Sequence, residues 1–122
     1  MKKLILIGVI FFVSSLAFAK NDHPEKWYQR TWCLEKKGQI EVVLPDKTRC
    51  DCLTDAHAVE FDFAKKWAEA IGQSLYYSLQ TGKRAGVVLI MENPKRDYKY
   101  WLRLNSTIEH FKLPIDTWTI GK

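Results

Sequence analysis

The feature that most constrains the fold is a continuous apolar run from Gly86 to Met91, bounded on both sides by residues that break regular structure. An apolar run without alternation is typical of a strand that is covered on both faces. Such a strand needs a sheet with other elements packed on each side of it. The run therefore predicts an α/β or α+β domain in which helices lie over the faces of a sheet.

Periodicity and turn residues elsewhere in the chain supply the elements that such a sheet requires. Their order is helix, three strands, helix, strand, helix, strand. The sequence contains no internal repeat and no Gly/Ser-rich linker, which favours a single domain. The predicted elements are helix 24–37, strands 40–44, 49–54 and 58–63, helix 64–81, strand 86–91, helix 96–111 and strand 115–120.

Two of these elements carry patterns that define their faces. On the third predicted strand, Val59, Phe61 and Phe63 share one face, whereas Glu60 and Asp62 share the other. The long helix that follows has apolar residues at helical spacing, and we expect them to form its buried face. These residues are Ala64, Trp67, Ala68, Ile71, Leu75 and Leu79.

The N-terminus has the pattern of an export signal. A basic start at Lys2 and Lys3 precedes the apolar run Leu4 to Val13, and Ala17-Phe18-Ala19 is typical of a cleavage site. We therefore expect residues 1–19 to be a signal peptide and residues 20–122 to form the exported domain, in the periplasm or outside the cell. Cleavage lowers the formal net charge from +5 to +3 and leaves no membrane attachment. The alternative is that the segment stays as an anchor helix.

The three cysteines all lie in the expected exported part, where disulfides persist. Cys50 and Cys52 are two residues apart on a predicted strand, so we expect their side chains to point the same way and not to bond each other. The sequence therefore predicts a disulfide from Cys33 to either Cys50 or Cys52. The alternative is three reduced, buried thiols. A zinc site is not expected, because a second pair of ligands is missing.

Acidic residues on the predicted strands carry a resemblance to a known family. The segments Arg49-Cys50-Asp51-Cys52-Leu53, Ala58-Val59-Glu60-Phe61-Asp62 and Gln73-Ser74-Leu75-Tyr76-Tyr77 resemble the motifs of the PD-(D/E)XK nuclease superfamily. That family has a restriction-endonuclease-like αβββαβ core with a mixed sheet flanked by helices. The resemblance matches Asp51 and Glu60 to its two acidic positions, Gln73 and Tyr77 to its helical motif, and Glu41 to a further acidic residue of some members.

The resemblance implies a metal-dependent nuclease. Asp51 and Glu60 lie on neighbouring predicted strands, so their carboxylates can converge and bind Mg²⁺ or Mn²⁺, with Glu41 as a further ligand. A bound metal activates water and stabilises charge on a phosphoryl group. Gln73 and Tyr77 would position the substrate or the ligands. The implied partner is a nucleic acid.

The sequence departs from the family pattern at one catalytic position. Asp62 stands where the motif has a lysine, and a carboxylate there supplies no positive charge. Lys65 and Lys66 follow closely, and Lys66 falls on the same helical stripe as Gln73 and Tyr77. We therefore expect Lys66 to replace the motif lysine.

Less specific interpretations of the same residues remain open. The acids Asp51, Glu60 and Asp62 form either a metal site or an exposed strand face. The helical stripe that carries Lys66 lies opposite the expected apolar face, so the alternative for Lys66 is exposure to solvent. A second function class is therefore an inactive descendant of the nuclease fold, retained as an exported binding or structural module. Other candidates are Asp55 and His57 as further ligands, and the clusters Lys83-Arg84 and Lys95-Arg96 as phosphate contacts.

Overall fold

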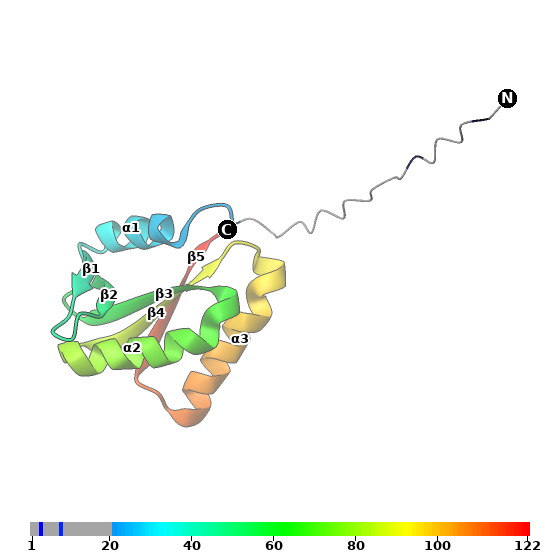
Figure 1. Cartoon of the computed structure of the whole chain (residues 1–122). Helices are drawn as coiled ribbons and strands as arrows, with labels where there is room; N and C mark the ends of the chain where they lie inside the picture. The colour runs from blue at the N-terminus through cyan, green and yellow to red at the C-terminus, as the bar shows by residue number, and fades with distance from the viewer. Residues whose placement is uncertain (1–2, 4–7, 9–20) are drawn as a thin grey trace.

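A computed structural model of the chain describes Lys3, Gly8 and residues 21–122 (Figure 1). The predicted signal peptide, residues 1–19, therefore lies outside the described residues apart from Lys3 and Gly8. No helix in the described part is long and apolar enough to cross a membrane. The elements are α1 (Glu25–Glu35), β1 (Gln39–Val43), β2 (Arg49–Leu53), β3 (His57–Phe63), α2 (Trp67–Thr81), β4 (Arg84–Met91), α3 (Pro94–Phe111) and β5 (Ile115–Gly121).

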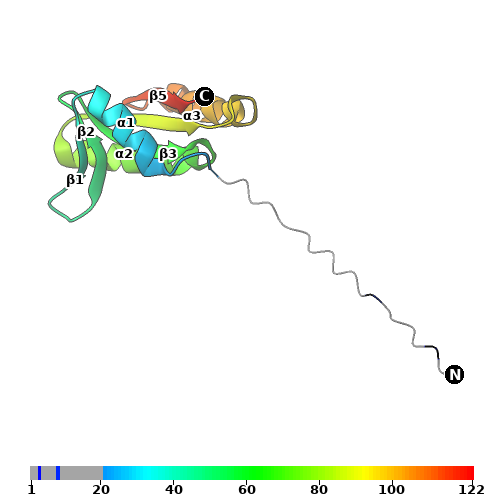
Figure 2. The same ribbon diagram turned by 90° about the horizontal axis from the view of Figure 1, so that it is seen from above.

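The strands form one mixed sheet in the order β1-β2-β3-β4-β5. Strand β2 is antiparallel to both β1 and β3, whereas β4 is parallel to both β3 and β5. Parallel neighbours need crossover connections, and α2 and α3 provide them. Figures 1 and 2 show α1 on one face of the sheet and the other two helices on the opposite face. The predicted sheet domain with flanking helices is confirmed.

The core confirms what the apolar run predicted. Side chains of β4 alternate between the two faces, and both faces are covered: Val87 and Leu89 pack with Leu104 beneath α2 and α3, and Val88 packs with Trp32 beneath α1. All three side chains of β4 named here are fully buried. β4 is thus an interior strand of the sheet that is covered on both faces.

The observed boundaries lie close to the predicted ones. The largest difference is at residues 64–66, predicted as the start of the long helix, which form a 3-10 turn before α2 begins at Trp67. Helix α3 begins at Pro94 rather than at Arg96, because the side chain of Asn93 caps it by accepting from the Arg96 N–H.

The expected buried face of α2 is wrong in part. Its buried residues are Ala70, Ser74 and Tyr77, whereas Leu79 is 79% exposed. Trp67, Ile71 and Leu75 are only partly buried and pack against the cluster that α2 shares with α3. The helix therefore turns Ala70, Ser74 and Tyr77 toward the sheet. Its apolar stripe fills the angle between the sheet and α3.

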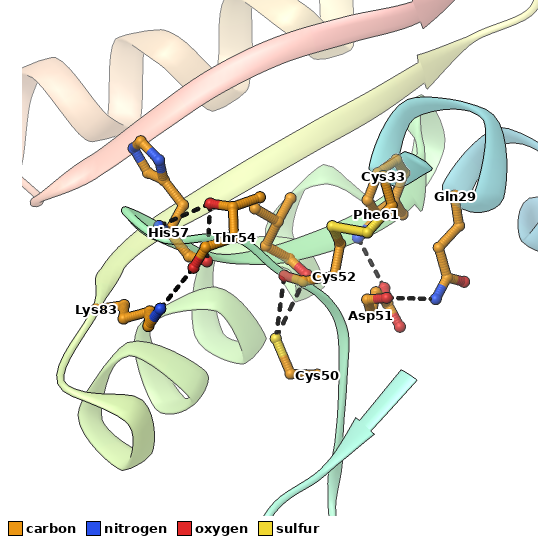
Figure 3. Close-up of a disulfide and its surroundings, with 10 residues drawn as sticks. Gln29, Cys33, Cys50, Asp51, Cys52, Thr54, His57, Phe61 and Lys83 are labelled. Carbon is orange, nitrogen blue, oxygen red and sulfur yellow. Dashed lines mark hydrogen bonds between the residues drawn. A yellow bond between two sulfur atoms is a disulfide. The ribbon is translucent and has the colours of Figure 1, made fainter. Parts of the chain in front are cut away.

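A disulfide from Cys33 to Cys52 joins α1 to β2, which confirms the predicted pairing of Cys33. Gly38 leaves room for it, since an added Cβ would lie 2.7 Å from the Cys52 sulfur. Cys50 is a buried free thiol whose sulfur donates to the carbonyl of Cys52 (3.4 Å), apart from the disulfide (Figure 3). Burial raises the pKa of this thiol to about 11, which keeps it protonated.

The expectation that Cys50 and Cys52 point the same way is wrong. Cys52 joins the core cluster beneath α1, whereas Cys50 packs with Tyr77 of α2. The strict alternation of β2 is therefore interrupted between them, at Asp51.

Removing the disulfide should destabilise the domain. We expect the double variant Cys33→Ser/Cys52→Ser to lose roughly 3 kcal/mol of unfolding free energy, because the reduced chain gains loop entropy when unfolded. Urea denaturation measures this loss, and Cys50→Ala serves as the control that keeps the disulfide. A wild-type midpoint that dithiothreitol leaves unchanged would contradict the expectation.

Candidate functional site

The candidate site lies where β2 and β3 separate. These strands pair at Cys52 with Val59 and at Leu53 with Ala58. Further along, the N–H of Phe61 donates to the Asp51 side chain, at Oδ2, over 2.8 Å. The carbonyl of Asp51 accepts instead from the side chain of Gln29 on α1, over 2.6 Å (Figure 3). Asp51 thus holds open a fork in the sheet, and α1 fixes its backbone.

The neighbouring strand β1 is also irregular at this point. Ile40 pairs with Cys52 and Val42 pairs with Cys50, so Glu41 lies between these pairs, opposite Asp51. Glu41 has a φ of +49°, in the left-handed region that side chains other than glycine rarely adopt. Backbone strain of this kind persists where the surrounding structure enforces it, and it often marks functional sites.

The Glu41 carboxylate pairs with two basic side chains at the surface. It lies 3.8 Å from Lys26 Nζ and 3.9 Å from Arg49 Nη1. Its negative charge still reaches Asp51 and contributes to raising the pKa of that carboxyl, although burial is the larger cause. Glu41 therefore flanks the fork, as the sequence placed it, but its first partners are basic side chains.

Glu60 and Asp62 project from β3 into the interior of the protein. They are only 4% and 5% exposed, so the alternative of an exposed acidic strand face is wrong. The reason is that α2 covers this face of the sheet, which a strand pattern cannot reveal. Glu60 Oε2 and Asp62 Oδ2 are buried and have no hydrogen-bond partner among the described residues. Unpartnered buried oxygens are costly and rare in native proteins.

Burial and mutual repulsion shift the titration of these acids. Burial raises the pKa of Glu60 far above its ordinary value, and the charges of Asp51 and Asp62 raise it further. A hydrogen bond between the two carboxyls adds to the rise of the Glu60 pKa and opposes the rise of the Asp51 pKa, which places the proton on Glu60. Burial, aided by Glu25 and Asp51, raises the pKa of Asp62 to about 7. The cluster therefore retains protons at neutral pH.

Glu25 is a member of this cluster that sequence reasoning missed. It lies in the first turn of α1. Burial and the charge of Asp51 raise its pKa, and Lys66 opposes the shift. An acid in the first turn of a helix ordinarily complements the helix dipole, so nothing in the sequence distinguished it. The only indication in the sequence was that Glu25 lies on the predicted helix directly before the three strands.

The structure brings some of the predicted helical residues to the site but not all of them. Lys66 precedes α2, and its positive charge acts on both Asp62 and Glu25. Tyr77 is buried, and burial followed by the charges of Glu60 and Asp51 raises its pKa. Gln73 is exposed and makes no side-chain hydrogen bond to the described residues.

The further ligand candidates lie elsewhere. His57 Nε2 is 2.7 Å from Asp116 Oδ2, which also accepts from Arg84 Nε over 2.8 Å. This pairing ties the start of β3 to β4 and β5. Asp55 is exposed in the turn before β3. Neither His57 nor Asp55 joins the carboxylates of the fork.

Within the described part of the chain, no three His, Cys, Asp or Glu side chains converge as a preformed metal site. Mg²⁺ does not need such a cage, because it keeps several waters and commonly uses one or two carboxylates together with substrate phosphate. The donor set of the fork consists of carboxylate oxygens, two of them without a partner. The residues present therefore fit a hard divalent cation.

No protein-family model, curated protein or solved structure matches this chain. The site is therefore interpreted from its own geometry.

The raised pKa of Asp62 predicts a specific pH dependence of stability. Its ordinary value is 3.8 and its value in the fold is about 7. The folded state thus binds the proton more tightly, and the stability it contributes is present below about pH 4 and lost as the pH rises through about 7. By this linkage the unfolding free energy of the metal-free protein falls by up to roughly 4 kcal/mol between about pH 4 and pH 7 because of this group.

Urea denaturation across this range compares wild type with Asp62→Asn, which we expect to show a shallower fall in unfolding free energy. Asp55→Asn is the matched control, since Asp55 is exposed. Parallel curves for wild type and Asp62→Asn between about pH 4 and pH 8 would contradict a raised pKa at Asp62.

Proposed function

We propose that the protein is a metal-dependent nuclease-like enzyme that hydrolyses phosphodiester bonds of nucleic acid at the fork between β2 and β3. The observation that carries this proposal is the pair of buried oxygens without a partner, Glu60 Oε2 and Asp62 Oδ2, beside Asp51. Like-charged groups held together at a cost to stability are typical of functional sites. A divalent cation would relieve both the repulsion and the missing contacts.

The arrangement of elements supports the family that the sequence resembles. The order α1-β1-β2-β3-α2-β4 reproduces an αβββαβ core, with β2 antiparallel to its neighbours and β4 parallel to β3. The matched acids Asp51 and Glu60 lie on the second and third strands, as in the PD-(D/E)XK superfamily. The restriction-endonuclease-like fold is therefore the fold we propose.

Asp51 and Glu60 would hold the Mg²⁺ or Mn²⁺ ion. When bound, the metal would lower the pKa of a water molecule and stabilise charge on the phosphoryl group. Glu41 is the weaker ligand candidate, because Lys26 and Arg49 already pair with it.

The remaining residues have roles that follow from their charges. Asp62, with a pKa of about 7, can accept the proton of the attacking water at neutral pH. As the water oxygen bonds to phosphorus, the bond from phosphorus to the leaving oxygen breaks, and that oxygen takes up a proton from solvent. Lys66 would supply the positive charge that the motif lysine provides, because its charge acts on Asp62. Tyr77 would help to position the ligands, because it is buried where the charges of Glu60 and Asp51 act on it.

The alternative function is an inactive descendant of this fold that serves as an exported binding or structural module. Two observations favour it. Asp62 occupies the position of the motif lysine, and a proton shared by Glu60 and Asp51 can stabilise the fork without metal.

Thermal melting with and without metal separates the two functions. We expect Mg²⁺ or Mn²⁺ to stabilise wild type, by about 2.7 kcal/mol at a hundredfold excess over Kd. Glu60→Gln should lose this response, yet be as stable as metal-free wild type or more so, because a neutral amide replaces an acid that is costly to bury. Asp55→Asn should behave as wild type. A wild-type melting temperature that does not change with either metal up to millimolar concentration would contradict the metal site and support the inactive descendant.

A nicking assay on supercoiled plasmid and on single-stranded circular DNA then tests the chemistry. We expect nicking by wild type that depends on Mg²⁺ or Mn²⁺ and is lost in Glu60→Gln. If metal stabilises the protein but nothing is cleaved, the defect lies at the missing lysine. In that case Asp62→Lys should restore nicking, and its failure to do so would rule out a nuclease lacking only this charge.

The proposed enzyme acts in the periplasm or outside the cell. The disulfide between Cys33 and Cys52 supports an oxidising compartment. Intact-mass measurement of the protein recovered from the periplasm or the medium should give a chain that begins at Lys20. Recovery from the cytoplasm, or retention of Met1, would contradict export with cleavage.

A further inference from the structure

A cavity of about 480 Å³ lies beside the candidate site, where β3 and β4 end and α3 begins. Its walls include Phe63, Lys65 and Lys66 after β3, and Arg96 and Tyr100 on α3. A cavity of this volume is in the range of small-molecule sites. It is therefore large enough to take one ligand unit rather than an extended surface.

The charges on its walls favour an anion. Lys65 and Lys66 are both exposed and form no salt bridge with the described residues. The two acids of the wall are already engaged: Asp97 accepts from Arg96 Nε over 2.8 Å, and Glu92 Oε2 accepts from the Tyr28 hydroxyl over 2.7 Å. Arg96 offsets the charge of Asp97, and Glu92 keeps its negative charge, so the two lysines leave the walls with a net positive charge.

The same walls also offer apolar contact. Phe63 and Tyr100 are aromatic and only partly buried, and Ile90 of β4 is buried in the same cavity. Aromatic rings beside cations are the features that single-stranded nucleic-acid sites use, because bases stack on the rings and phosphates pair with the cations.

Lys66 connects this cavity to the carboxylates. It lines the cavity, and its charge also acts on Asp62 and Glu25. Phe63 directly follows Asp62 along β3. A phosphate bound by Lys66 would therefore lie at the border between the cavity and the fork.

We propose that this cavity binds one unpaired nucleotide of a single-stranded nucleic acid, with its phosphate on Lys65 and Lys66 and its base against Tyr100 or Phe63. This inference rests on the proposed function and specifies its substrate. A base inside a duplex is stacked and paired, so it cannot enter the cavity unless it leaves the helix. The preferred substrate is thus a single strand or an unpaired strand end.

Binding without metal tests the inference separately from cleavage. The probe is a fluorescently labelled oligothymidylate with a free 5′-phosphate, measured by anisotropy in EDTA. We expect Lys65→Ala and Tyr100→Leu each to weaken binding about tenfold, as the loss of one charge-assisted contact or one stacked base predicts. Thermal melting verifies that each variant is folded.

Lys36→Ala is the matched control. Lys36 lines a different cavity with Trp32 and Trp118, beneath α1 and on the opposite face of the sheet. Its loss should change the affinity less than twofold. Equal weakening by Lys36→Ala and Lys65→Ala would overturn the inference, because binding would then follow overall charge. Equal affinity for a blunt duplex of the same length, or no binding by wild type, would also overturn it.

The two proposals fail in different ways. If the protein binds the oligonucleotide through Lys65 and Tyr100 but neither responds to metal nor cleaves, the nucleotide site is supported and the nuclease function is contradicted. A protein that cleaves with metal, while Lys65→Ala and Tyr100→Leu bind and cleave as wild type does, keeps the nuclease and loses the cavity.

Discussion

One hydrogen bond determines the shape of the candidate site. Because the N–H of Phe61 donates to the side chain of Asp51, the β2 backbone at this point is not paired with β3, and the sheet opens. The carbonyl of Asp51 accepts from the side chain of Gln29 on α1, so this carbonyl and the N–H of Phe61 both have partners. The fork, the reversed direction of Cys50 and the gathering of acids around Asp51 all depend on this exchange.

The fork costs stability, and the surrounding structure offsets the cost. Glu60 and Asp62 are buried without full hydrogen bonding, and Glu41 adopts a left-handed conformation opposite Asp51. The disulfide to Cys33 ties β2 to α1 one residue from Asp51, and the apolar strand β4 packs on both faces. The strained part of the sheet is therefore bordered by its most constrained parts, which is the arrangement expected where an unfavourable geometry has to be maintained.

The order of elements was predictable, because each has a clear period or an apolar run, as β4 does. The shared face of Glu60 and Asp62 followed from strand alternation. Their burial did not, because alternation gives the face of a strand and not what covers it. The buried face of α2 was predicted only in part, because apolar residues such as Leu75 pack in the angle between the sheet and α3. Glu25 was missed because its approach to Asp51 depends on how α1 crosses the sheet, a tertiary property.

In the metal site that we propose, protons and metal ions would compete for the same oxygens of the fork. In the absence of metal, a proton on Glu60 bridges to Asp51, and Asp62 is about half protonated near neutral pH. A divalent cation binds carboxylates in their charged form, so it must displace these protons, and its affinity rises with pH. The buried acids thus stay compatible with a folded protein before metal arrives, because protonation removes their charge. The same acids become ligands only when the cation replaces the proton, which links the stability of the fold to the chemistry proposed for the site.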